Sequence, residues 1–247
     1  MKIFVRVLPL LTLLSCGTFE GYWTDGQKGA VQVQLRTDEW LTSYGGRTVI
    51  AAGGSFNLFC REKESRKLWA RSRDPKIVLV PEDDQKSGRE PVADTGGRWR
   101  VSYALSAPGP GKVILDFGEG DTVVDSVELD VKKVDRFLWK VATEKLRSRQ
   151  KGGGLELFVG DAIEIRIEYI DERSWALVGI GAFDYEFLDA GTDATGTTSG
   201  CCAFKFVSTE GPSNTIRLEA TQQGSTTLTL RARGGSSAKL AIPVLVR

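Results

Sequence analysis

The feature that most constrains this chain is a series of short segments in which apolar and polar residues alternate. Residues 31–35, Val-Gln-Val-Gln-Leu, are a clear example, and similar segments recur about every ten residues. Successive side chains of a β-strand point to opposite faces, so such alternation predicts strands with one buried face. Many short strands separated by turn residues predict an all-β fold made of antiparallel β-sandwiches.

The two halves of the chain share this pattern. When the sequence is shifted so that Leu115 falls on Leu228, Gly111 falls on Gly224, and the flanking alternating segments also coincide. A repeat of this size is typical of an array of domains. The predicted domains are residues 31–134 and 135–247.

The last three strands of each predicted domain resemble those of bacterial immunoglobulin-like domains, which occur in series along surface adhesins and cell-wall proteins. In both halves a glycine precedes the penultimate strand, in segments 111–117 and 224–230. The resemblance implies two tandem immunoglobulin-like β-sandwiches with an interaction or spacer role. It differs from antibody domains, because no cysteine lies on strand 112–117 to pair with Cys60. It carries over no functional residue.

The first 15 residues have the parts of a secretory signal peptide. Lys2 and Arg6 are basic, and residues 7–14 are mostly apolar. This segment is shorter than the about 20 apolar residues that span a bilayer as a helix. Leu13-Leu14-Ser15-Cys16 resembles the lipobox of bacterial lipoproteins, in which cleavage leaves the cysteine at the new N-terminus.

This second resemblance implies a diacylglycerol on Cys16 and an acyl chain such as palmitate on its amino group. Two or more acyl chains hold a protein firmly to a membrane. Residues 16–30 are predicted to be a lipidated flexible tether, because they are rich in glycine and polar residues. Gly17 favours the outer membrane over the inner membrane as the location in the cell envelope.

The composition excludes several classes of function. The chain has no histidine, which excludes Ser-His-Asp and Cys-His catalysis and any zinc site that uses histidine. The net charge of +1 lacks the basic excess of a nucleic-acid-binding protein. We therefore predict no catalytic residue, no metal, no cofactor and no nucleic-acid partner.

Three cysteines remain after Cys16, namely Cys60, Cys201 and Cys202. Three cysteines cannot all pair within one chain. They predict either one disulfide or none, with a vicinal Cys201–Cys202 bridge as a further alternative.

Two other segments are candidates for binding. The loop 189–200 is rich in glycine and threonine, and Asp189 and Asp193 could supply oxygen ligands to calcium or to another ligand. The alternative is a solvated hairpin loop. The basic residues between Lys140 and Lys151 could contact anionic headgroups, or could form a solvated linker between the domains.

The sequence thus predicts a lipid-anchored, non-enzymatic binding or spacer protein of the cell envelope, held to the membrane through Cys16 and with an envelope protein or a glycan as partner. One alternative is a carbohydrate-binding accessory or a carbohydrate-active enzyme that uses paired carboxylates. Another is a structural subunit of an envelope complex, which would expose an apolar patch or a free edge strand.

Overall fold

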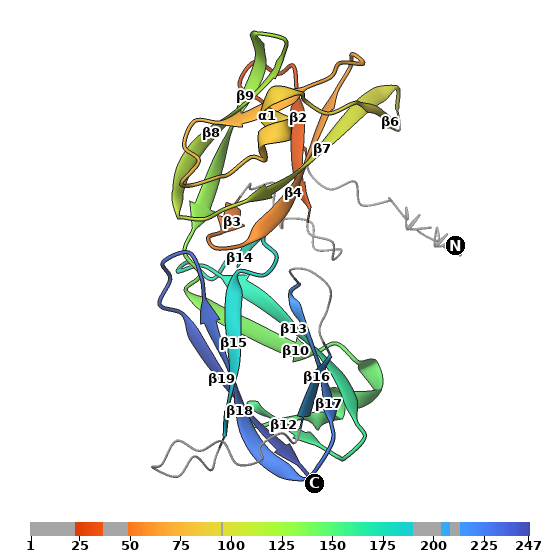
Figure 1. The fold of residues 1–247 in the computed structure, drawn as a ribbon, viewed down its shortest axis with the longest axis vertical. Coiled ribbons are helices and arrows are strands. Elements are labelled where there is room, and N and C mark those ends of the chain that lie inside the picture. Colours follow the sequence, from red (N-terminus) through yellow and green to blue (C-terminus); the bar gives the residue numbers. More distant parts are fainter. Residues whose placement is uncertain (1–22, 37–48, 95, 190–203, 208–212) are drawn as a thin grey trace, which may run out of the picture.

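The computed structural model describes residues 23–36, 49–94, 96–189, 204–207 and 213–247. They form two β-sandwiches that lie end to end along the long axis of the molecule (Figure 1). Each sandwich consists of two sheets with a hydrophobic core between them. The predicted all-β fold class is confirmed.

The first sandwich has one sheet of order β1-β2-β4-β7-β6 and one of order β3-β9-β8-β5. The first sheet contains β1 (Thr24–Asp25), β2 (Gln32–Arg36), β4 (Ser55–Glu62), β7 (Arg98–Ser106) and β6 (Val92–Asp94). The second contains β3 (Val49–Ala51), β9 (Thr122–Lys132), β8 (Gly111–Glu119) and β5 (Trp69–Ser72). A short helix, α1 (Glu82–Lys86), lies against β5.

The second sandwich repeats this plan. One sheet contains β10 (Arg136–Val141), β13 (Ala162–Ile170), β17 (Thr215–Ala220) and β16 (Phe204–Val207), with β14 (Ala176–Leu177) also paired to β13. The other contains β11 (Gln150–Lys151), β12 (Gly154–Leu157), β19 (Lys239–Val246), β18 (Gly224–Ala232) and β15 (Phe183–Asp189). A 3-10 helix, η1 (Glu144–Arg149), precedes β11.

The strand order identifies the fold. In the first sandwich, strands β2, β4, β5, β6, β7, β8 and β9 take the places of strands A to G. The two sheets are then A-B-E-D and C-F-G, which is the immunoglobulin arrangement. The second sandwich has the same order, and in both a short early strand pairs in parallel with the last strand, as β3 does with β9 and β12 with β19. The predicted tandem immunoglobulin-like sandwiches are therefore confirmed as the fold.

The glycine shared by the two halves has a structural cause. Gly111 begins β8 and Gly224 begins β18, with φ angles of +147° and +159°. Residues other than glycine rarely adopt such angles. At Gly111 a Cβ would also lie only 2.7 Å from Cδ1 of Ile77. The chain therefore needs glycine where it enters the penultimate strand.

The N-terminal segment differs from the predicted tether. Thr24 and Asp25 pair with Val33 and Gln32 of β2, so this part of residues 16–30 extends a sheet. The main-chain N–H of Gly26 then donates to the carbonyl oxygen of Val31 at 2.8 Å, which closes a tight loop. From Thr24 onward the chain is thus held against the first sandwich.

The basic segment also differs from a linker between domains. Lys140 lies on β10 and Arg147 and Arg149 lie in η1, all within the second sandwich. Lys140 pairs with Glu168 at 2.7 Å, and Arg149 pairs with Asp161 at 3.2 Å. The charges are thus largely used in local ion pairs, because strands and loops of the same domain place carboxylates beside them.

Among the residues that the structure describes, none forms a helix that is long and apolar enough to cross a membrane.

Candidate functional site

The outer end of the first sandwich, the end remote from the second sandwich, contains a buried carboxylate. Asp125 on β9 lies opposite Phe117 of β8 and is fully buried. Its two carboxylate oxygens accept hydrogen bonds from the main-chain N–H groups of Lys28 at 2.8 Å and of Ala30 and Val31 at 2.9 Å. Hydrogen bonds from several N–H donors offset the free-energy cost of removing a carboxylate from water. Asp125 therefore fixes the N-terminal loop to the sandwich.

Gly26 completes this attachment. A Cβ at residue 26 would lie 2.4 Å from Oδ2 of Asp125, so only glycine allows the loop to close over the carboxylate. The N–H of Gln27 donates to the carbonyl oxygen of Ser126 at 2.8 Å. Residues 26–31 thus wrap around one acidic side chain, and we call this arrangement the Asp125 clasp.

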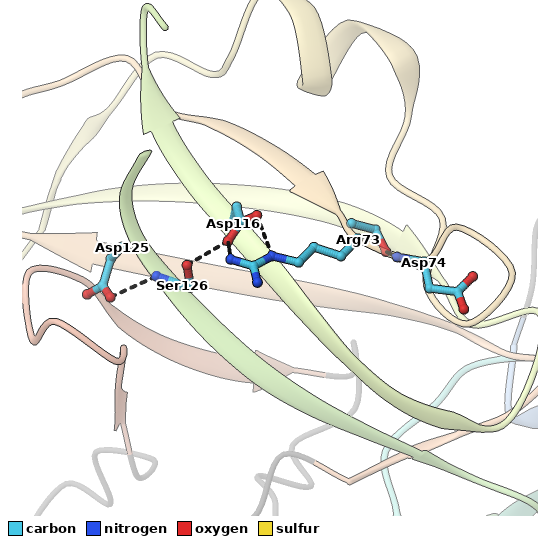
Figure 2. Close-up of polar contacts among 6 residues, drawn as sticks. Arg73, Asp74, Asp116, Asp125 and Ser126 are labelled. Carbon is cyan, nitrogen blue, oxygen red and sulfur yellow. Dashed lines mark hydrogen bonds and ion pairs between the residues drawn. The ribbon is translucent and has the colours of Figure 1, made fainter. Parts of the chain in front are cut away.

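The polar contacts continue onto the neighbouring strand (Figure 2). The Ser126 N–H donates to Asp125 at 2.7 Å, and the Ser126 hydroxyl donates to Asp116 at 2.6 Å. Two N–H groups of Arg73 donate to the two oxygens of Asp116, each at 2.9 Å. The Arg73 hydrogen bonds hold the pKa of Asp116 below its usual range. With each carboxylate held by donors, the chain of contacts is a structural link rather than a reactive centre.

A second buried acid lies at the same end. The buried side chains of β4 alternate with outward ones, and Glu62 occupies the last inward position after Phe56, Leu58 and Cys60. The Glu62 side chain is only 1% exposed, and Nε of Arg66 lies 3.1 Å from its Oε2. Burial raises the pKa of Glu62 to about 7, against the opposing charge of Arg66, while Glu64 and Glu119 add to the rise.

We expect Glu62 to make the stability of the protein depend on pH. Its pKa is about 7 in the folded protein and near 4.5 when unfolded, so the folded state binds more protons between these values. Stability therefore falls as pH rises through this window. Replacement of Glu62 by Gln should raise the free energy of unfolding by about 2–3 kcal/mol above the window and flatten its pH dependence.

Urea unfolding across this pH range measures the effect. Glu144→Gln is the matched control, because Glu144 lies in the second sandwich, away from the charges that shift the pKa of Glu62, and its side chain is 83% exposed. A Glu62→Gln protein with the same pH profile as the wild type would contradict the expectation.

The two sandwiches meet at a joint made by main-chain hydrogen bonds. The N–H of Ala51 donates to the carbonyl oxygen of Val178 at 2.8 Å, and the N–H of Val178 donates to that of Val49 at 3.0 Å. Ser55 and Ile180 exchange two further hydrogen bonds, of 2.9 and 2.7 Å. Ala51 also packs into the core of the second sandwich and Val178 into that of the first. The two domains are thus joined as parts of one folded unit.

Side chains add to the joint. Lys132 of the first sandwich forms an ion pair of 3.1 Å with Asp171 of the second. Burial tends to raise the pKa of Asp171, but hydrogen bonds from Trp175, Lys132 and Arg173 outweigh it and lower the pKa overall. The Ser236 hydroxyl donates to the carbonyl oxygen of Val134, which lies between β9 and β10 and packs in the core of the second sandwich.

We consider two grooves on the described surface as candidate binding sites. One, of about 410 Å³, lies beside the joint and is lined mainly by polar and charged residues, among them Lys132, Lys133 and Glu172. The other, of about 520 Å³, lies on the first sandwich, where Phe59 and Val92 meet Arg100. Within the described part of the chain, no three Cys, Asp or Glu side chains gather as metal ligands would.

The predicted site residues have different outcomes. Cys16, Cys201, Cys202 and Asp193 lie outside the described residues. Asp189 ends β15, opposite Thr226 of β18. Cys60 is a free thiol in the core of the first sandwich, and burial raises its pKa, so it packs as a small apolar side chain. Asp125 and Glu62 are not among the residues that the sequence pattern singled out, although both continue an alternating series.

No family model matches the sequence, and a search of curated proteins finds no match. Among solved structures, domains 5–6 of the S-layer protein SbsC align with 13% identity and a TM-score of 0.31, over 87% of this chain and 99% of that one. The adhesin InvE of Yersinia pseudotuberculosis aligns with 10% identity and a TM-score of 0.33, over 91% of this chain and 60% of that one. The Escherichia coli adhesin FdeC aligns with 12% identity and a TM-score of 0.30, over 92% and 66%.

Proposed function

We propose that this protein is a non-enzymatic lipoprotein of the bacterial cell envelope that holds two rigidly joined immunoglobulin-like modules at a short distance from a membrane. Its lipid would be attached to Cys16, and its modules would serve as a binding or spacer element. The sequence Leu13-Leu14-Ser15-Cys16 supports the attachment, and the structure supports the mechanical part of the proposal.

The Asp125 clasp is the observation that carries this proposal. Because the chain is fixed from Thr24 onward, only the seven residues 17–23 separate Cys16 from the first sandwich. Seven residues span at most about 25 Å when fully extended. A lipid on Cys16 would therefore hold the first sandwich close to the membrane surface. A flexible tether that extended through residue 30 would instead allow the sandwich to move much further away.

The joint also supports a spacer role, because it limits the movement of the second sandwich relative to the first. A flexible linker would let the second sandwich rotate freely, whereas four main-chain hydrogen bonds fix it relative to the first. The far end of the second sandwich, formed by the turn before Gly224 and the end of β19, lies opposite the joint. A partner that binds this end would therefore contact the protein in a defined orientation.

Lipid attachment is tested in cells with Cys16→Ala. We expect the wild-type protein to stay with membranes after a high-salt wash, which screens electrostatic contacts, and to incorporate labelled palmitate; the Cys16→Ala protein should do neither. Cys202→Ala is the matched control, because it removes a cysteine outside the lipobox and should keep both properties. Equal labelling and membrane retention of the Cys16→Ala protein would refute lipid anchoring.

A further inference from the structure

The outer face of the sheet β1-β2-β4-β7-β6 carries three arginines at neighbouring positions. Arg61 of β4 lies directly opposite Arg100 of β7, and Arg98 lies two residues before Arg100 on the same face of that strand. Like charges in directly opposite positions destabilise a sheet. The direct pairing of Arg61 with Arg100 is therefore a cost to the sheet that other contacts have to offset.

Two of these guanidinium groups converge on one acceptor. Nε of Arg61 donates to Oε1 of Gln32 at 2.9 Å, and Nη1 of Arg98 donates to the same oxygen. The amide nitrogen of Gln32 in turn donates to Asp25 at 2.7 Å. A neutral amide oxygen thus occupies the meeting point of two positive groups, a position that suits the oxygen of an anion.

The arginines of the second sandwich are arranged differently. Arg217 lies 2.6 Å from Glu164, and Arg231 lies 2.6 Å from Glu186 across neighbouring strands. Around the first set, Asp94 lies 3.9 Å from Arg100 and directly opposite Arg98 on the neighbouring strand. Arg73 of the first sandwich pairs with Asp116 in the same way, so what sets Arg61, Arg98 and Arg100 apart is that they gather on one face.

Aromatic rings accompany the arginines. Cζ of Arg61 lies 4.1 Å from the ring centre of Trp23, and Cζ of Arg100 lies 5.3 Å from that of Phe59. Tryptophan and arginine together are typical of surfaces that meet the headgroup region of a bilayer. Trp23 also directly precedes β1, at the end of the segment that leads to Cys16.

We propose that Arg61, Arg98 and Arg100 form a binding face for phosphate groups of anionic membrane lipids. Guanidinium groups bind phosphate through paired N–H donors, which fits a cluster of three. The proposal rests on the proposed function, because a lipid on Cys16 would bring this face within reach of the headgroups. The protein would then have two contacts with the membrane, the lipid and the arginine face.

Sedimentation with vesicles tests the proposal. The chain of residues 17–247 retains every described residue and has no lipid, so its binding reports the face alone. We expect it to bind phosphatidylglycerol vesicles more tightly than phosphatidylcholine vesicles. The variant Arg61→Gln/Arg98→Gln/Arg100→Gln should lose affinity for the anionic vesicles by on the order of 100-fold, since each basic residue near an anionic surface contributes about 5-fold.

The control variant Arg217→Gln/Arg231→Gln removes two arginines from the second sandwich and should bind as the wild type does. Circular dichroism checks that each variant keeps its β-sheet spectrum. Displacement by millimolar inorganic phosphate would identify the phosphate group itself as the ligand, and resistance would identify the array of headgroups; either result supports the face. Equal binding to both vesicle types, or an equal loss in the control variant, would overturn the proposal. Neither result depends on whether Cys16 is lipidated.

Discussion

Replacement of Asp125 by alanine is expected to lower the free energy of unfolding by about 3–5 kcal/mol. The change removes the acceptor of the N–H groups of Lys28, Ala30 and Val31, and it leaves the N–H of Val31, which is buried, without this partner. Buried donors without a partner cost more than the hydrogen bond itself contributes. Urea denaturation of the full chain measures the loss, and hydrogen exchange at these three amides shows whether the loop opens.

Glu128→Ala is the matched control for this prediction. Glu128 lies on the same strand, but its side chain is 52% exposed and its ion pair with Lys112 is on the surface. Such pairs contribute about 0–1 kcal/mol. If Asp125→Ala costs no more than Glu128→Ala, the clasp does not hold the N-terminal loop.

Opening of the clasp would also change the proposed tether. With residues 24–31 released, the segment between Cys16 and the first fixed strand would double in length, from residues 17–23 to residues 17–31. The Asp125→Ala protein should therefore be cut more readily by proteases between Cys16 and Gln32, while the sandwich cores stay protected. Asp125 thus links the stability of one domain to its distance from the membrane.

Much of the fold follows from the alternating pattern, but the two buried acids do not. The series Val127, Leu129 and Val131 leads back to Asp125, and the series Phe56, Leu58 and Cys60 leads on to Glu62. Buried positions predicted from alternating apolar residues extend only as far as the first polar residue in the series. The strands continue to the end of the sandwich, where loops supply the donors and charges that allow a polar side chain to be buried.

The joint and the sheet order could not be predicted from local patterns. The hydrogen bonds of the joint connect residues 49–55 with residues 178–180, which lie far apart in the sequence and in short segments without clear periodicity. The basic residues around Lys145 were consistent with a linker between the domains. The sequence of this segment does not show which carboxylates the fold places beside these residues.

Replacement of Gly234 by valine is expected to separate the two sandwiches. Gly234 has a φ of +66°, and a Cβ there would lie 2.4 Å from the carbonyl carbon of Ala52 in the first sandwich. Because main-chain atoms on both sides of the joint are in contact here, neither can move without breaking its hydrogen bonds. We expect the coupling between the domains to fall by on the order of 3 kcal/mol, from strain and lost contacts.

Calorimetry and small-angle scattering measure this separation. The wild-type protein should unfold in one main transition and have a single elongated shape, because the joint couples the two cores. The Gly234→Val protein should show two transitions and a wider distribution of dimensions.

Gly235→Val provides the control, because Gly235 has a φ of +74° but no atom within 4 Å of its Cβ position. It therefore carries a similar backbone strain without the collision with Ala52. If both variants unfold alike, backbone strain alone explains the effect, and the joint does not couple the domains. If only Gly234→Val divides the transition, close packing at the joint is what makes two immunoglobulin-like modules behave as one rigid spacer.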